Sequence, residues 1–310
     1  MIDIPFCKGW GYHTDTPQWE KETAHWRWEF LLYVRRINMK NYLNETYTDL
    51  IVEVGAPLLW VTLNRPQHSN AFSDEMITGL CRLLREADWD EDIRVIILTG
   101  AGKTFCAGGD VNAMEEKTGM FAGDPEELRR RYTRGIQQIP LTIESLHTPL
   151  LAMVNGAAIG AGCDLACMCD IRLGCRHSRF GETFAKLALV PGDGGTFFLQ
   201  RIVGYAKAME LSLTGKIISA DEALALGLLN HLAEEDTLKK ETETLACSIA
   251  ANSPVAVSMI KKALRQARTA EISGHLDLLA AFQGITQRTD DHFEGVRALK
   301  EKRQPHFTGH

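Results

Sequence analysis

Three short segments rich in small residues combine backbone N–H groups with a carboxylate, a combination suited to the chemistry of a carbonyl group. Residues 105–110 read Phe-Cys-Ala-Gly-Gly-Asp, residues 154–164 pass through three glycines before an aspartate, and residues 189–196 contain Pro-Gly-Asp-Gly-Gly. Glycine lets a backbone approach a ligand closely, and N–H groups exposed in such turns stabilise a developing oxyanion. Each segment alone is also compatible with an ordinary turn.

The second segment needs a strand before it and a helix after it. A buried strand is expected at residues 150–154 and a helix at about 164–168, with residues 156–162 as a small-residue turn between them. The first N–H groups of that helix have no partner, and the helix dipole favours negative charge there. Asp164 in the first turn either complements this dipole or faces the same site. The glycines do not fit the dinucleotide fingerprint G-x-G-x-x-G.

Alternating strands and helices around these segments predict an α/β fold. Further strands are expected at residues 49–54, 58–63, 93–98 and 170–173. Ser73 is the predicted cap of a helix with apolar residues at helical spacing to Ala87, and an Arg-rich helix is expected around residues 126–138. Its three consecutive arginines, 129–131, fit a solvated helix face.

The C-terminal third is predicted to be helical. Ser219 and Glu222 suit a capping box, Pro254 suits the first position of a helix, and two more helices are expected at residues 275–287 and 292–302. We therefore divide the chain into an N-terminal extension (1–45), a sheet-rich core (46–205) and a helical module (206–310).

Read together and in this order, the segments resemble the crotonase family, also called the enoyl-CoA hydratase/isomerase superfamily. The matching stretches are residues 63–66, 70–71, 105–110, 154–171, 191–196, 213–228 and 301–309. The resemblance covers roughly residues 46–310. It implies a spiral core of repeated ββα units, a C-terminal helical trimerisation module and a homotrimer or hexamer.

The family binds acyl-CoA thioesters and stabilises an enolate with two backbone N–H groups. Carried over by motif, these donors are Gly109 and Ala161. Lys302 matches a lysine that contacts CoA phosphates in relatives, and Ala107 and Asp110 fall at CoA-binding positions. The resemblance implies no cofactor, because CoA is part of the substrate, and no metal.

The acids depart from the family pattern. Hydratases of the family use two glutamates, whose positions here hold Asp164 and Phe184. Phe184 can neither activate water nor deliver a proton. Glu182 would share a face with Phe184 in an extended segment and could substitute for the missing acid. Asp193 lies at or within one residue of an aspartate that double-bond isomerases of the family carry.

The pattern around these acids also resembles ring-opening isomerases of phenylacetate breakdown, through the spacing of Phe184, Lys186, Leu189 and Pro191. An acid in an apolar site has a raised pKa, which suits proton removal next to a thioester. We rank Asp193 first, Asp164 second and Glu182 third as the catalytic acid. The expected activity is double-bond isomerisation or hydration of an enoyl-CoA. The alternative is a catalytically silent protein of this fold that binds CoA esters or partners.

Composition excludes several other classes. The 310 residues carry a net charge of −6, which disfavours nucleic-acid binding through a basic surface. No apolar run is long enough to span a bilayer, and the N-terminus lacks the pattern of a secretory signal. We therefore expect a cytoplasmic protein with reduced thiols, no membrane partner and cysteines that are not spaced for zinc. No nucleophile elbow of a hydrolase is present.

The first 28 residues are unusual because they hold four of the six tryptophans. Residues 26–37 could form a short helix, and Met39 would be a natural start for a protein of this family. We expect residues 1–38 to play no part in catalysis.

Overall fold

The computed structural model describes residues 41–43 and 45–310. The tryptophan-rich segment and the helix predicted for residues 26–37 lie outside the described residues. Residues 45–310 form one compact unit. Within the described part of the chain, no helix is long and apolar enough to cross a membrane.

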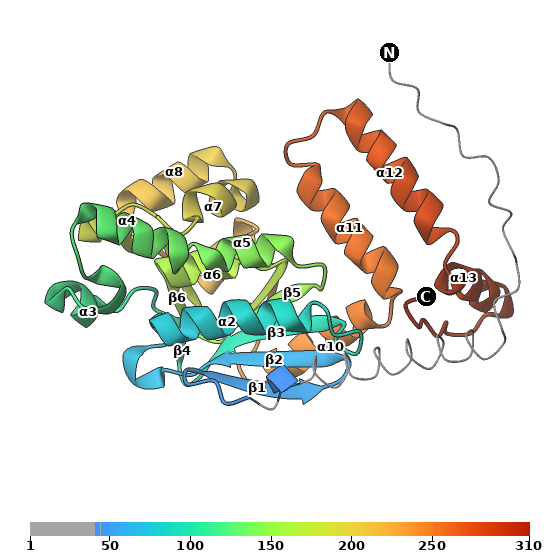
Figure 1. The fold of residues 1–310 in the computed structure, drawn as a ribbon, viewed down its shortest axis with the longest axis horizontal. Coiled ribbons are helices and arrows are strands. Elements are labelled where there is room, and N and C mark those ends of the chain that lie inside the picture. The colour runs from blue at the N-terminus through green and yellow to red at the C-terminus, as the bar shows by residue number, and fades with distance from the viewer. Residues whose placement is uncertain (1–40, 44) are drawn as a thin grey trace, which may run out of the picture. The chain divides into compact units, whose positions relative to one another are not determined.

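A six-stranded sheet runs through the centre of this unit, in the order β1-β2-β3-β5-β7-β10 (Figure 1). Its strands are β1 (Leu50–Gly55), β2 (Leu58–Leu63), β3 (Val95–Gly100), β5 (Leu150–Val154), β7 (Ile171–Cys175) and β10 (His231–Ala233). β1 and β2 form the predicted antiparallel hairpin, and the remaining neighbours pair in parallel.

Both faces of the central strands are covered, which explains their nearly continuous apolar sequence. On one face Trp60, Ile97 and Leu173 pack against helix α10 (Leu238–Ala250). The alternate side chains, such as Leu59 and Ile96, are fully buried as well. Helices α2 (Asp74–Ala87) and α5 (Gln138–Ser145) pack against each other, and Figure 1 shows them on the sheet face away from α10.

A second sheet of four short strands, in the order β4-β6-β8-β9, contains parts of two of the three chemistry-bearing segments, 105–110 and 154–164. These strands are β4 (Thr104–Cys106), β6 (Ala157–Ile159), β8 (Arg179–Gly181) and β9 (Ile217–Ser219). The prediction of a plain turn at residues 156–162 is therefore wrong in part, since β6 pairs there with both β4 and β8. Two of the three residues of β6 are alanine, which is depleted in strands, so the sequence carries only a weak strand signal there.

Two helix predictions need correction and one is confirmed. Ser73 caps α2 by accepting a hydrogen bond from the Met76 N–H at 3.0 Å. Helix α6 (Ala161–Met168) begins three residues earlier than predicted. The helix expected at residues 126–138 is two helices, α4 (Pro125–Arg134) and α5, because the chain turns at Gly135.

The C-terminal third contains two short strands, β9 and β10, in addition to the predicted helices. Its helices are α8 (Tyr205–Thr214), α9 (Ala220–Ala225), α10, α11 (Pro254–Gln266), α12 (Ile272–Thr286) and α13 (Asp290–Glu301). Only half of the expected capping box forms: Ser219 accepts from the Glu222 N–H, whereas the Glu222 side chain pairs with Lys216 at 2.7 Å. Figure 1 shows α11 and α12 side by side, apart from the two sheets.

The remaining elements are short. They are η1 (Asn41–Leu43), η2 (Pro66–His68), α3 (Val111–Glu116), η3 (Gly119–Phe121), η4 (Thr183–Leu187) and α7 (Gly195–Val203). α3 follows the segment 105–110, and η4 and α7 flank the segment 189–194, so each candidate motif lies at the junction of two elements.

Candidate active site

The end of β4 lies directly against the N-terminus of α6. Gly108 has φ +83°, and a β-carbon there would lie 2.7 Å from the Ile159 carbonyl oxygen and 2.9 Å from the Ala161 nitrogen. A β-carbon on Gly162 would lie 2.0 Å from the Cys106 carbonyl oxygen. Only glycine fits at these two contacts, so the glycines of two predicted motifs bring the motifs together.

Asn70 fixes the strand that leads into this contact. Its buried side-chain amide donates to the carbonyls of Ala101 and Thr104, at 2.9 and 2.7 Å. Phe72 adds a backbone contact to the loop after β4, because its N–H donates to the Gly108 carbonyl at 2.8 Å. Hydrogen bonds from residues 70–72 therefore hold β4 and the loop that follows it.

The two predicted oxyanion donors are left without partners. Within the described part of the chain, neither the Gly109 N–H nor the Ala161 N–H donates a hydrogen bond. Gly109 follows the residue that touches Ala161, and Ala161 is the first residue of α6, where the helix dipole is positive. The structure thus brings two unsatisfied N–H groups together, as a carbonyl oxygen that gains negative charge requires.

The three candidate acids form one buried cluster. Asp164 lies in the first turn of α6, Glu182 immediately precedes η4, and Asp193 precedes α7. Their exposed fractions are 0%, 1% and 3%. The Asp164 carboxyl is within hydrogen-bonding reach of both other acids. A single helix therefore carries the N–H group of Ala161 and the central acid of the cluster.

These carboxyls lack N–H and O–H donors, and burial favours their neutral forms. Both oxygens of Asp164, both of Glu182 and one of Asp193 have no N–H or O–H partner among the described residues. Burial, the largest cause, raises the pKa of all three groups, that of Glu182 to about 7. The charges of Asp193 and Glu182 raise the pKa of Asp164 further. Ionised carboxylates within hydrogen-bonding reach repel one another, so the cluster favours protonation of its members over full ionisation.

The structure changes the relationship between Glu182 and Phe184. Phe184 lies in the 3₁₀ helix η4, so the expected extended segment with both side chains on one face is wrong. Glu182 instead points into the buried acid cluster. The Phe184 ring is half-buried, 3.8 Å from the position that a β-carbon on Gly160 would take. An aromatic ring therefore stands beside the N-terminus of α6 where relatives of the hydratase type are expected to place an acid.

The predicted CoA-binding residues fall in two places. Ala107 and Asp110 flank Gly109; Ala107 donates its N–H to the Ser69 carbonyl at 3.0 Å. The Asp110 carboxylate caps α3 by accepting a hydrogen bond from the Asn112 N–H at 3.1 Å, so it already has a structural role at the start of that helix. Lys302 ends α13, which Figure 1 shows far from α3 and α6. Within one copy of the chain, Lys302 is not brought to this site.

Two residues next to Asp193, Tyr132 and Gln137, were not predicted as site residues from the sequence. Tyr132 of α4 packs on Gly192, and the Gln137 side chain donates to the Gly192 carbonyl at 2.7 Å. The charge of Asp193 contributes, after burial, to a raised pKa of Tyr132. No sequence signal marked either residue, because the Arg-rich helix around them had the composition of a solvated surface.

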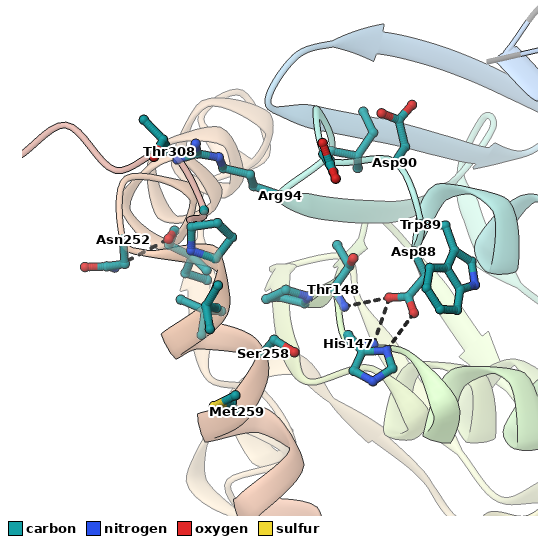
Figure 2. Close-up of a pocket in the computed structure, with 18 of the residues that line it drawn as sticks. Asp88, Trp89, Asp90, Arg94, His147, Thr148, Asn252, Ser258, Met259 and Thr308 are labelled. Carbon is teal, nitrogen blue, oxygen red and sulfur yellow. Dashed lines mark hydrogen bonds and ion pairs between the residues drawn. The ribbon is translucent and has the colours of Figure 1, made fainter. Parts of the chain in front are cut away.

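A separate cavity of about 420 Å³ lies elsewhere, between the loop that precedes β3 and the start of α11 (Figure 2). Its lining includes Trp89, Arg94, His147 and Thr308, and none of the three buried acids. His147 pairs there with Asp88 at 3.0 Å. In the described residues, no group of three or more His, Cys, Asp or Glu side chains is placed to hold a metal ion.

The fold is that of a known class of protein. Residues 53–310 match the model of the enoyl-CoA hydratase/isomerase family, and the chain belongs to that family. This chain has the crotonase-type fold, because its structure is similar to the crystal structure of an enoyl-CoA hydratase from Bacillus anthracis. The two structures superpose with a TM-score of 0.80 at 32% sequence identity. That likeness covers 85% of this chain and 100% of the other.

Relatives carry names of both reaction types. The chain is 35% identical to a 1,2-epoxyphenylacetyl-CoA isomerase of Escherichia coli, over 84% of this chain and 98% of the relative. It is 34% identical to a 2,3-dehydroadipyl-CoA hydratase of the same organism, over 84% of this chain and 99% of the relative. The predicted membership of the enoyl-CoA hydratase/isomerase family is thus confirmed, and its reaction type stays open between isomerase and hydratase.

Proposed function

We propose that the chain is a double-bond isomerase of enoyl-CoA thioesters, with Asp193 as the acid that moves the proton. The observation that carries the proposal is the position of Asp193: buried, with a raised pKa, within hydrogen-bonding reach of Asp164 in the helix that offers the Ala161 N–H. A base with a raised pKa is suited to removing a proton next to a carbonyl.

The reaction needs one mobile proton. The Asp193 carboxylate removes a proton from the α-carbon, and the electron pair of that C–H bond moves into a conjugated enolate. The N–H groups of Gly109 and Ala161 hold the charged oxygen of the enolate. The protonated Asp193 then returns the proton to the γ-carbon, the electrons move back, and the double bond has shifted toward the thioester. No further cofactor is required.

Hydration is the second candidate, and the contact between Glu182 and Asp164 favours it. Water addition requires one group to activate water and another to deliver a proton. These two acids are adjacent, and the pKa of Glu182, raised to about 7 by burial, suits either task. Against it stands Phe184, an aromatic ring at the position of the second hydratase acid.

We also propose the roles that the family implies for CoA and for assembly. The Ala107 carbonyl accepts no hydrogen bond within the described chain and is available to the nucleotide end of CoA, next to Asp110. Lys302 would reach the CoA phosphates of a neighbouring copy. The helices α11 to α13 support a homotrimer or hexamer, because they expose apolar side chains: Ile260, Leu264, Ile272, Leu276, Ile285, Phe293 and Leu299.

The assay that tests the function compares three substrates. A 3-enoyl-CoA, a dienoyl-CoA and crotonyl-CoA are incubated separately with the protein, and the absorbance of the conjugated thioester is followed. An isomerase raises this absorbance with the 3-enoyl-CoA; a hydratase lowers it with crotonyl-CoA. Binding of all three without conversion would contradict both enzymatic proposals and favour the CoA-ester-binding scaffold.

A further inference from the structure

The segment that carries Asp193 has few connections to the rest of the chain. Residues 190–193 lie between η4 and α7, and the side chain of Val190 is 77% exposed. Within the described residues, one hydrogen bond joins the backbone of this segment to another part of the fold. In that bond the Gln137 Nε2 donates to the Gly192 carbonyl at 2.7 Å. The place of Asp193 therefore depends on the residue that anchors its neighbour.

A second contact to Gly192 comes from Tyr132, which lies five residues before Gln137 in the sequence. A β-carbon on Gly192 would lie 3.1 Å from Tyr132 Cε1, so the tyrosine ring packs directly on this glycine. The Gln137 N–H donates to the Tyr132 carbonyl at 3.1 Å, which ties the two residues together. The turn at Gly135, where α4 ends, brings both of them onto the segment that carries Asp193.

The segment that contains Tyr132 and Gln137 is connected through α5 to α6, the helix that offers the Ala161 N–H. Gln137 immediately precedes α5, whose residues Ile139 and Ile143 are buried. α5 packs against both α2 and α6. Because α6 carries the Ala161 N–H, a short chain of contacts links Gln137 to one of the two oxyanion donors.

We propose that Gln137 is a positioning residue that holds the Asp193 carboxyl at a set place relative to the Ala161 N–H. The inference rests on the proposed isomerase function, and it names a residue that acts through the Gly192 backbone without touching the substrate. Misplacement of a catalytic group by about 1 Å can cost about 100-fold in rate, so loss of this hydrogen bond should be visible in kcat.

The groups that face Asp193 come from several elements and all bear on its ionisation. They are Asp164 of α6, Glu182 before η4, Tyr132 of α4 and Cys106 of β4. All are neutral or negative. Loosening the segment would admit water and let the Asp193 pKa fall, whereas a new carboxylate at residue 137 would raise it.

The test uses Gln137→Met, which keeps the side-chain length and removes the donor. Its matched control is Gln138→Met, because Gln138 also bonds a backbone carbonyl, that of Thr133 at 2.8 Å, without contact to the segment of Asp193. With the full-length protein and a substrate that the wild type isomerises, Gln137→Met should lower kcat about 10- to 100-fold. KM should stay within about threefold, since CoA binding does not involve Gln137.

A pH profile separates positioning from a general loss of structure. Gln137→Glu should move the acid limb of the kcat profile to higher pH, because its carboxylate repels the ionised Asp193. Gln138→Glu should leave that limb in place. A merely structural role of Gln137 predicts that the neutral variant Gln137→Met has a lower melting temperature with the pH profile of the wild type, and this result would overturn the inference.

One measurement keeps the inference independent of the proposed function. The Asp193 pKa is followed by NMR of protein labelled with ¹³C-aspartate, with Asp193→Asn to assign the signal. If the wild type isomerises nothing, the proposed function fails, and a lowered Asp193 pKa in Gln137→Met alone still supports positioning. Equal kcat and equal Asp193 pKa in Gln137→Met and Gln138→Met would refute it.

Discussion

The Asp164 carboxyl occupies the space into which any side chain at residue 195 would extend. A β-carbon on Gly195 would lie 2.0 Å from Asp164 Oδ1, well inside contact distance. The glycine after the acid-bearing segment is therefore what allows α7 to start beside the acid cluster.

Substitution Gly195→Ala should displace Asp164 and disturb the whole cluster. We expect a loss of about 1–3 kcal/mol in the free energy of unfolding, as for other overpacked sites, and a fall in kcat of at least about 100-fold. Chemical denaturation and steady-state kinetics measure the two effects. Gly284→Ala is the control, because nothing lies within 4 Å of that position in α12 and alanine favours the helix. Full activity of Gly195→Ala would contradict the packing argument.

Substitution Ala161→Pro removes one oxyanion donor and no side-chain function. Proline is tolerated at the first position of a helix, and residue 161 is the first residue of α6. The loss of an oxyanion donor should lower kcat about 10²- to 10³-fold. Asp290→Pro, at the exposed first position of α13, is the control and should retain activity. Equal kinetics of the two variants would show that the Ala161 N–H does not hold the enolate.

Substitution Asp193→Asn should abolish isomerisation and preserve binding of CoA esters. The amide keeps the shape of the side chain and cannot accept the α-proton, so kcat should fall about 10²- to 10⁴-fold. Turnover of a 3-enoyl-CoA and calorimetric titration with a CoA ester are the measurements. Asp164→Asn serves for comparison. If it is inactive while Asp193→Asn retains activity, Asp164 is the catalytic acid and our ranking is wrong.

Substitution Glu182→Gln should change the pH dependence of stability. The pKa of Glu182 is raised by burial from 4.5 to about 7 in the folded state. Between these values the folded state binds more protons than the unfolded state, so stability falls as pH rises from about 4.5 to 7. This difference in the pKa of Glu182 between the unfolded and folded states corresponds to a change of about 3 kcal/mol in the free energy of unfolding. Denaturation at several pH values should show a smaller decline for the variant, and parallel curves would exclude this burial effect.

Substitution Leu276→Glu tests the exposed apolar surface of α12. No residue of this helix is buried within one copy of the chain, and Leu276 is 55% exposed. A charge buried at a subunit interface is costly, so the variant should dissociate to monomers in light-scattering measurements. Gln283→Glu adds the same charge at an exposed polar position and should remain oligomeric. A monomeric wild type would contradict the proposed assembly.

The sequence was most informative where local chemistry decides the structure. Ser73 predicted the start of α2 to the residue, because a side-chain cap acts within one turn. The family resemblance named Gly109 and Ala161 as a pair of donors, whereas strand β4 and its contact with α6 were not predicted. β6 was missed because two of its three residues are alanine and its pairing partners are distant in sequence.

The acid cluster shows what sequence alone could not supply. Asp164, Glu182 and Asp193 were all candidates, but their burial in one cluster depends on how β8, η4 and α7 turn. Glu182 was assigned to an extended segment, whereas a 3₁₀ turn begins directly after it. Gln137 carries no local signal, since its hydrogen bond joins residues 55 positions apart.

The glycine contact between β4 and α6 has a consequence for how such proteins diversify. Because backbone atoms set the separation between Gly108 and Ala161, the proposed oxyanion site does not depend on which side chains surround it. The acids reside on separate connections, before η4 and before α7, that can be exchanged one at a time. A lineage could lose an acid at the position of Phe184 and recruit another nearby while the backbone contact between β4 and α6 stays unchanged.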